Sequence, residues 1–328
     1  MIRILNEKEI RGIVSLDSSV IAAIETAFSE LDNGNALVPP IMMIPVPEKT
    51  GEVDIKSAYI KGYNQLAVKV ASGFFENPGL GLPSQSGQML VISAETGFLQ
   101  GVLLDNGYLT QVRTGAAGAV AAKYLAPQQV ETVGVIGSGV QARFQMEALM
   151  QVRPFSSIRM FSLDSDDDKD RYVRDMRQML KVEVVKSPSV EAVVKESSIV
   201  VTTTPARRGF VKSQWLHPGL HITAMGSDTE EKQELEADVL AGADLVACDL
   251  KSQSFRLGEL RSALEQNLMT EDSAVVELGA IINGKARGRS DDRQITVCDL
   301  TGVGVQDTMI AIKTLALANE RNIGLVVL

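Results

Sequence analysis

The chain has 328 residues, of which 45% are hydrophobic and 22% charged, and its formal net charge is −9. This length exceeds what a single compact core reaches, so we expect two domains. The composition is that of ordinary globular proteins, which excludes small stapled scaffolds and disordered or fibrous chains. The negative charge argues against nucleic acid as a partner, because phosphate binding requires clustered Lys and Arg.

The cysteine, histidine and hydropathy patterns further narrow the class of protein. Cys248 and Cys298 lie in apolar, strand-like surroundings without C-x-x-C spacing, which predicts core packing and no metal site. His217 and His221 flank a predicted turn and are interpreted as structural residues. No signal peptide and no window of about 20 uncharged apolar residues occurs. We therefore expect a cytoplasmic protein that does not enter a membrane.

The first third of the chain predicts a helix followed by a sheet. Apolar residues at helical spacing predict one helix over residues 8–31, which ends at Asn33-Gly34. Short runs rich in β-branched residues between 52 and 104 are separated by turns and predict an antiparallel sheet. Residues 114–125 are rich in Ala and Gly and predict a close-packing helix that stops before Pro127.

Strands and helices alternate in the rest of the chain. The expected strands are residues 131–137, 157–163, 181–185, 197–204, 221–225, 244–249 and 294–300. Alternation predicts a parallel sheet with helices on both faces, because each crossover returns a helix over the sheet. The predicted fold class is α/β: a Rossmann-type doubly wound domain over 116–304, and an α+β domain with a mainly antiparallel sheet over 1–115, completed by a C-terminal helix within 305–328.

A glycine-rich turn follows the first strand of the parallel sheet. The apolar strand at 132–136 leads into Gly137-x-Gly139-x-x-Ala142, and a helix begins at once. The first glycine permits a tight turn, the second permits close approach of a pyrophosphate, and the small Ala142 lets the helix meet the strand. The helix N-terminus then attracts the anion. The pattern predicts a dinucleotide site, with a plain structural turn as the alternative.

The end of the next strand bears on the choice between NAD and NADP. Asp164 lies 25 residues after Gly139, near the spacing of an acid that binds the ribose 2′-hydroxyl, although Ser162 is a second candidate for that position. The acidic run Asp166, Asp167 and Asp168 would repel a 2′-phosphate, so the sequence favours NAD, with NADP as the alternative. The run is also compatible with a solvated helix N-terminus.

The order of motifs resembles the ornithine cyclodeaminase/mu-crystallin family. The motifs are PGLGLPSQSG, LLDNGYLTQVRTGAAGAVAAKYLA, VGVIGSGVQARFQ, VTTTP, HPGLHITAMGSDTEEKQEL and VCDLTGVGVQD, between about residues 35 and 310. The resemblance implies a homodimer whose first domain builds the dimer sheet and the substrate site, while the second holds NAD(P). It also implies cyclodeaminase, alanine dehydrogenase or imino-acid reductase activity.

Three residues match the family's chemical residues. The resemblance places Lys69 at the substrate, Arg113 beside the coenzyme, and Asp228 as the catalytic acid. Cations suit a substrate carboxylate, and an imine carbon that accepts a hydride needs a proton at its nitrogen. The alternatives are that Lys69 points to the solvent face of its strand, that Arg113 is a surface charge, and that Asp228 caps a helix opened by TEEKQEL.

The resemblance also implies a wider set of coenzyme contacts. They are Ser86, Arg113, Thr114, Gly137, Gly139, Val140, Gln141, Ser162, Asp164, Thr202, Thr203, Met225, Lys232 and Thr301. Each of these, taken alone, is also compatible with a turn or core position.

Two positions depart from the ornithine-converting members. Met43 stands where those proteins carry an arginine for the substrate carboxylate, and Lys56 stands near a position where they carry an acid. A cation there disfavours ornithine, because like charges in a desolvated pocket repel. The segments around Lys56 and Lys69 look closest to the branch of ectoine breakdown and iminosuccinate reduction.

The sequence therefore predicts an NAD(P)H-dependent reductase of a small 2-imino acid, with a dicarboxylic one such as iminosuccinate among the candidates. In this hypothesis Lys69, with Lys56 or Arg113, binds carboxylate, and Asp228 handles the proton. One alternative is a cyclodeaminase that uses bound NAD+ and releases ammonia. The other is a mu-crystallin-like binding protein without turnover, because this fold hosts all three functions.

Overall fold

A computed structural model describes residues 1–327 of the chain. The chain forms two compact units, Met1–Arg113 with Val303–Leu328, and Thr114–Gly302. The division falls inside helix α3 (Tyr108–Leu125) and lies two residues before each predicted boundary. The roles predicted for the two domains are separate from this division and stay predictions.

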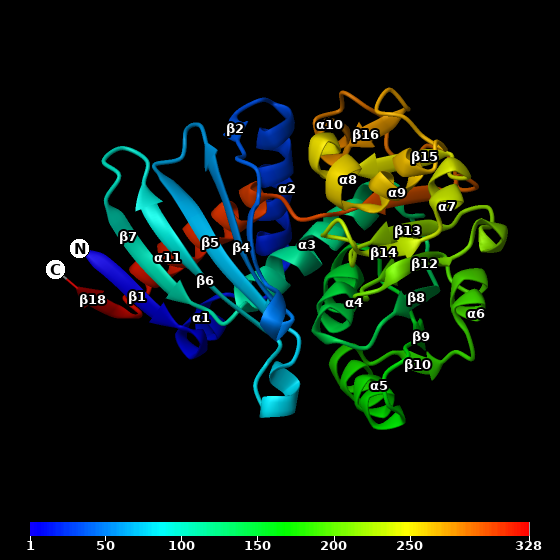
Figure 1. Cartoon of the computed structure of the whole chain (residues 1–328), viewed down its shortest axis with the longest axis horizontal. Helices are drawn as coiled ribbons and strands as arrows, with labels where there is room; N and C mark the ends of the chain where they lie inside the picture. Colours follow the sequence, from blue (N-terminus) through cyan, green and yellow to red (C-terminus); the bar gives the residue numbers. More distant parts are fainter. Residues whose placement is uncertain (328) are drawn as a thin grey trace. The chain divides into compact units, whose positions relative to one another are not determined.

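The first unit is built on an eight-stranded sheet. Its strands are β1 (Ile2–Asn6), β2 (Ala36–Leu37), β3 (Met42–Val46), β4 (Gly51–Ile60), β5 (Gln65–Phe74), β6 (Gln85–Ser93), β7 (Leu99–Leu104) and β18 (Leu325–Val327). The order is β18-β1-β7-β6-β5-β4-β2, and β3 also pairs with β4 (Figure 1). Only the β1–β7 pairing is parallel among these described strands. The predicted mainly antiparallel sheet is confirmed.

The predicted single helix over 8–31 is wrong, because the structure has two helices there, α1 (Glu7–Ile13) and α2 (Ser18–Asp32). Val14 adopts extended backbone, and the Asp17 carboxylate accepts from two backbone N–H groups to cap a new helix. Within residues 1–327, no single helix is long and apolar enough to cross a membrane. The pair α1 and α2 reaches that length and hydropathy only together, across a 97° bend.

Helix α11 (Gly304–Glu320) packs against β4, β5 and β6 of the same sheet. Gly304 lies so close to β4 that a Cβ there would meet the Ser57 carbonyl oxygen at 2.3 Å. Thr308 donates to the Ala58 carbonyl at 2.8 Å and accepts from the Ala67 amide at 3.3 Å. The first turns of α11 are therefore fixed against the two strands that carry Lys56 and Lys69.

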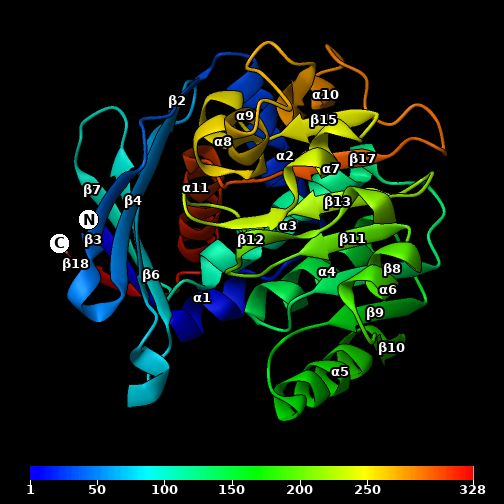
Figure 2. The same ribbon diagram turned by 45° about the vertical axis from the view of Figure 1, so that its right-hand side comes forward.

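The second unit is a Rossmann-type sheet with a small accessory sheet. Its strands are β8 (Thr132–Ile136), β9 (Ser157–Phe161), β10 (Glu183–Lys186), β11 (Ile199–Thr202), β12 (Arg207–Val211), β13 (His221–Ala224), β14 (Gln233–Leu235), β15 (Leu245–Cys248), β16 (Val275–Glu277) and β17 (Thr296–Asp299). The large sheet is parallel in the order β10-β9-β8-β11-β13-β17-β15-β16, while β12 and β14 pair separately (Figure 2). The predicted parallel doubly wound sheet is confirmed.

Helices cover both faces of the large sheet. They are the later part of α3, then α4 (Val140–Val152), α5 (Asp166–Leu180), α6 (Val190–Lys195), α7 (Ala237–Ala241), α8 (Lys251–Leu257), α9 (Glu259–Glu265) and α10 (Leu278–Ile282). Residues of β11 alternate between the two cores: Ile199 and Val201 pack with α4 and α5, and Val200 packs with α6 and α7.

Cys248 and Cys298 are buried free thiols, and His221 is bonded to two threonines.

Replacing Gly304 by Ala should destabilise the first unit. The added Cβ would clash with backbone that cannot move aside as a flexible side chain could, so we expect a loss of about 1–3 kcal/mol in urea unfolding. Gly12→Ala is the matched control, because a Cβ at that position would have no atom within 4 Å and alanine favours the helix α1. Equal stability of the two variants would contradict the close packing of α11.

Candidate functional site

A buried ionic cluster lies in the core of the first unit. Lys69 Nζ on β5 lies 2.9 Å from one oxygen of Asp307 and 3.0 Å from the other, and Arg113 Nε donates to Asp307 at 2.9 Å. Arg113 also donates to the Gln306 amide oxygen at 2.9 Å. Lys69 and Asp307 are at most 2% exposed. Asp307 therefore ties strand β5 and helix α3 to the start of α11.

A second lysine and a second acid border the cluster. Lys56 on β4 is the cross-strand partner of Lys69, so both side chains lie on one face of the sheet, and both are buried. Asp105 follows β7 and is also buried, and the charge of Lys69 acts on it. The structure thus brings Lys56, Lys69 and Arg113 together. The alternatives that Lys69 points to solvent and that Arg113 is a surface charge are wrong, because both side chains are buried.

Burial is the largest single influence on the pKa of each of these groups. It lowers the pKa of Lys69 to about 7, with the charge of Asp307 opposing it and those of Arg113 and Lys56 adding to it. It also raises the pKa of Asp105 to about 6. Burial alone would raise the pKa of Asp307, but the charges of Arg113 and Lys69 outweigh it and lower that pKa. An anion next to Lys69 would therefore raise its pKa and favour the charged form of the side chain near neutral pH.

The cluster brings three basic side chains into one buried position. Lys56, Lys69 and Arg113 lie there together with the acids Asp105 and Asp307. Buried cations are costly unless an opposite charge lies nearby, and a carboxylate that arrived there would lower that cost. The chemistry of this cluster thus fits a small carboxylate ligand.

The glycine turn of the second unit has the geometry of a phosphate cradle. Gly137 adopts φ +115°, and a Cβ there would lie 2.6 Å from Thr203 Oγ1, so only glycine fits without strain. A Cβ on Gly139 would have no atom within 4 Å, which leaves room for a ligand. Gly139 precedes α4 without capping it through a side chain, and Ala142 is fully buried. The amides of the α4 N-terminus can thus donate hydrogen bonds to the oxygens of a pyrophosphate.

The acid at the end of β9 is held by two serines. One Asp164 oxygen accepts from Ser162 Oγ at 2.6 Å and from the Ser138 hydroxyl of the glycine turn. Ser162 and Asp164, the two alternatives for the ribose position, are therefore neighbours in one group. Asp166, Asp167 and Asp168 form the first turn of α5, which agrees with the alternative that this run is a helix N-terminus.

The loops that follow β11 and β13 meet at the same edge of the sheet. The Thr203 amide donates to the Ile136 carbonyl at 2.9 Å, and the Met225 amide donates to the Thr202 carbonyl at 3.1 Å. The hydroxyl of Thr202 is buried and donates to Glu234 at 2.6 Å. The Thr301 hydroxyl is similarly engaged by Asp249 and Gln253. These hydroxyls therefore fix the backbone at this edge of the sheet through hydrogen bonds to buried side chains.

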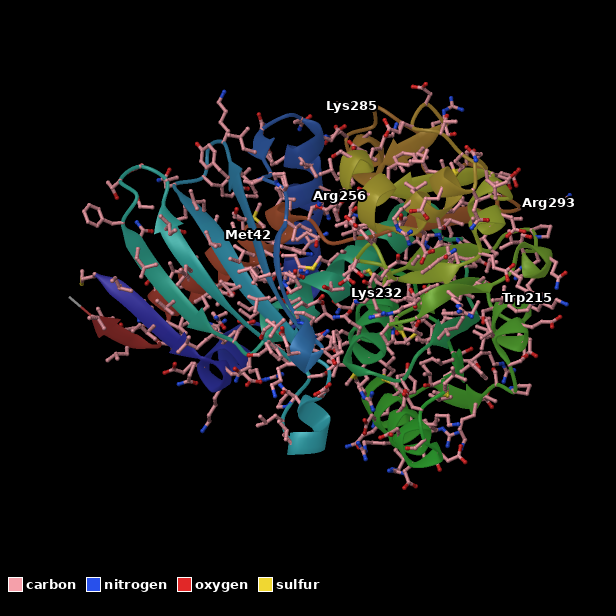
Figure 3. All side chains as sticks on the ribbon, in the orientation of Figure 1. Met42, Trp215, Lys232, Arg256, Lys285 and Arg293 are labelled. Carbon is pink, nitrogen blue, oxygen red and sulfur yellow. The ribbon has the colours of Figure 1, made fainter. Side chains whose placement is uncertain are left out.

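Asp228 lies in the loop between β13 and β14. Its Oδ1 accepts from Lys232 Nζ at 2.6 Å, and 44% of its side chain is exposed (Figure 3 labels Lys232). The alternative that Asp228 caps a helix opened by TEEKQEL is wrong, because turns and strand β14 follow it. The β12–β14 pairing draws this segment into extended backbone.

The remaining predicted contacts lie in both units. In the first unit, Ser86 on β6 is exposed, and Met43 on β3 is 45% exposed and pairs with Asp54. In the second, Thr114 accepts through its carbonyl from Gln145, and Val140 and Gln141 begin α4 with partly or largely exposed side chains. Their roles toward a coenzyme or substrate stay predictions.

Sequence reasoning missed three residues that organise these sites. Asp307 lies inside the motif VCDLTGVGVQD, where an acid in an apolar helix was an available signal. Arg143 bonds the Ser138 carbonyl at 2.5 Å and the Gly139 carbonyl at 3.1 Å, and so braces the glycine turn. Glu234 binds both loops at the edge of the sheet and had no local signal beyond its position in EKQEL.

Asp307→Asn should strongly destabilise the first unit, because it removes the buried carboxylate that Lys69 and Arg113 share. We expect a loss of about 3–5 kcal/mol in urea unfolding. The double variant Lys69→Met/Asp307→Asn should lose less than the sum of the two single variants, because methionine removes one uncompensated charge. Strict additivity would show that Lys69 and Asp307 are not coupled.

Comparison with known proteins places the chain within one family along nearly its whole length. A model of the ornithine cyclodeaminase/mu-crystallin family matches residues 3–318. An uncharacterised cyclodeaminase of Sinorhizobium fredii is 45% identical, over 98% of this chain and 97% of its own length.

Two solved structures show the same fold. One is Thermococcus litoralis Δ1-pyrroline-2-carboxylate reductase in complex with NADH and L-proline, with a TM-score of 0.94 and 29% identity over 99% of this chain and 100% of that chain. The other is the iminosuccinate reductase of Paracoccus denitrificans in complex with NAD+, with a TM-score of 0.90 and 28% identity over 99% and 98% of the two chains. The chain belongs to the ornithine cyclodeaminase/mu-crystallin family.

Proposed function

We propose that this protein is an NAD(H)-dependent reductase that converts a small 2-imino acid into the amino acid. The observation that carries the proposal is the buried cluster of Lys56, Lys69 and Arg113, in which three basic side chains meet within the core. A 2-imino acid offers a carboxylate beside the carbon to be reduced. The two similar structures, bound to NADH and to NAD+, belong to reductases of imino acids, which supports the same reaction class.

The second unit would hold the coenzyme. Gly137, Gly139 and the first amides of α4 would receive the pyrophosphate, and Ser162 or Asp164 would bond the adenosine ribose. A carboxylate at that position repels a 2′-phosphate, which favours NAD over NADP. When bound, the reduced nicotinamide supplies a hydride to the imine carbon.

The chain's own residues would bind the substrate and move the proton. Lys69 and Arg113 would hold the substrate carboxylate, with Asp307 fixing both cations in place. The imine nitrogen must carry a proton before its carbon accepts hydride, and we propose that Asp228, whose exposed carboxylate accepts from Lys232, relays this proton from solvent to the nitrogen. The nitrogen stays bonded to the reduced carbon and becomes the amine of the product amino acid.

Lys56 would influence which substrate side chains can bind. It is buried next to Lys69, so an aminoalkyl side chain such as that of ornithine would meet a like charge in a desolvated position. Lys56 would offer a second cation to a dicarboxylic substrate such as iminosuccinate.

We also propose that the first unit forms a homodimer interface, as the family resemblance implies. The support is the apolar side chains of Met42 and Ile44, which lie on one face of β3 and are 58% and 47% exposed (Figure 3 labels Met42). Adjacent apolar side chains of this size are the kind that a subunit contact covers.

The reaction class can be tested by following oxidation of NADH and NADPH with pyruvate, oxaloacetate or glyoxylate plus ammonium. We expect saturable oxidation of NADH with at least one of these acids, and weaker oxidation of NADPH. In Lys56→Met, turnover of oxaloacetate with ammonium should fall more than that of pyruvate if Lys56 binds a second carboxylate. Release of ammonia from an amino acid without net change in nicotinamide absorbance would instead identify a cyclodeaminase.

Asp228→Asn should lower kcat by about a hundredfold or more, since proton transfer by a positioned side chain contributes at least that much. The dissociation constant for NADH should stay near that of the wild type, because the glycine turn is unchanged. Glu230→Gln is the matched control, because Glu230 is an exposed acid of the same loop. If both variants keep wild-type kcat, Asp228 has no catalytic role.

A further inference from the structure

A fully buried carboxylate joins the two loops at the C-terminal edge of the parallel sheet. One oxygen of Glu234 accepts from Thr202 Oγ1 at 2.6 Å and from the Gly226 amide at 2.7 Å. The other accepts from the Thr204 amide at 2.6 Å and the Thr204 hydroxyl at 2.8 Å. Glu234 therefore links the segment after β11 to the segment after β13.

These loops border the place where a dinucleotide binds in such sheets. The chain runs outward from β8 to β9 and β10, and then returns to place β11 on the other side of β8. The loops after β8 and β11 thus flank the topological switch point, where ligands bind in open α/β sheets. Thr203, beside two of the Glu234 contacts, also bonds the Ile136 carbonyl at the end of β8.

The loops around Glu234 are packed without slack. A Cβ on Gly226 would meet the Thr204 carbonyl oxygen at 2.3 Å and Glu234 Oε2 at 2.6 Å. A second buried acid holds the strand that carries Glu234: Glu259 accepts from the amides of Glu234 and Leu235 at 2.7 and 3.1 Å. The position of the Glu234 carboxylate is therefore set by β14 and not by the loops alone.

The partners of Glu234 suit positioning better than stability. The four groups that donate to Glu234 are neutral amides and hydroxyls. Burying a carboxylate against neutral donors costs free energy, whereas burying an apolar side chain of similar size would not. Burial raises the pKa of Glu234, while the bonds from Thr202, Thr204 and Gly226 lower it. What this arrangement provides is a fixed geometry for two loops at once.

We propose that Glu234 is a positioning residue for the nicotinamide half of the coenzyme: it acts through Thr202–Thr204 and Met225–Gly226 and does not touch the ligand itself. The inference rests on the proposed function. The adenosine half is assigned to the turn after β8 and to Ser162 and Asp164, which Glu234 does not contact. Disturbing Glu234 should therefore weaken one half of the site and spare the other.

The test compares binding of NADH and ADP to the wild type and to Glu234→Gln by calorimetry. The glutamine amide places an N–H against donors on one side, so we expect NADH to bind at least about tenfold more weakly. ADP, which lacks the nicotinamide half, should change less than about twofold. Thr204→Val removes one hydroxyl donor and should produce a smaller loss of NADH affinity of the same kind.

His221→Gln is the control for general loss of stability. His221 is a buried polar residue at the opposite end of β13, and it bonds Thr223 and Thr296. This variant should have a lower melting temperature than the wild type and bind NADH normally.

Equal losses of NADH and ADP affinity in Glu234→Gln, or no loss of either, would overturn the inference. If Glu234→Gln does not fold, unchanged NADH binding by Thr204→Val overturns it. Failure of the wild type to bind NADH would instead remove the proposed function.

Discussion

The contact of Asp307 with Lys69 and Arg113 is the interaction on which the first unit depends. It joins residues that are 238 and 194 positions apart in the sequence, in a core where each of them alone would be an uncompensated charge. The glycine at the start of α11 and the Thr308 hydroxyl bring the helix close enough for that contact to form. The C-terminal helix is thus part of the site and not an appendage to it.

The two units differ in the sign of the charged side chains that they bury. In the first, Lys56, Lys69 and Arg113 are buried together, and the Asp307 carboxylate holds two of these three side chains in place. In the second, Glu234, Glu259 and Asp249 are buried acids that accept from backbone amides and hydroxyls at the ends of the parallel strands. Burial raises the pKa of each of these three acids, against the bonds that they accept. These acids hold the loops and strand ends at this edge of the sheet through hydrogen bonds from neutral donors.

Local patterns predicted what local physics determines. The strands and the glycine turn were predictable, because alternation, β-branched runs and the Gly137-x-Gly139 spacing lie within single elements. The break at Val14 was missed, since the apolar spacing continues across it and only the cap at Asp17 reveals the second helix. The helix suggested after Asp228 failed because pairing of β14 with β12 overrides local preference. Lys69, Lys56 and Arg113 were named from the sequence, whereas Asp307 and Glu234 were not, because their importance arises from partners in distant segments.

We propose that the cluster around Lys69 binds a carboxylate and that the anion restores the full charge of this lysine. Because burial holds the pKa of Lys69 at about 7, the side chain is mostly neutral at pH 8 in the free protein. A bound anion raises that pKa, so binding must take up a proton. Calorimetry of oxamate binding to the NADH-loaded protein at pH 8, in two buffers of different ionisation enthalpy, measures this directly. We expect uptake of nearly one proton, which disappears in Lys69→Met, whereas oxamate binding without proton uptake would contradict this role of Lys69.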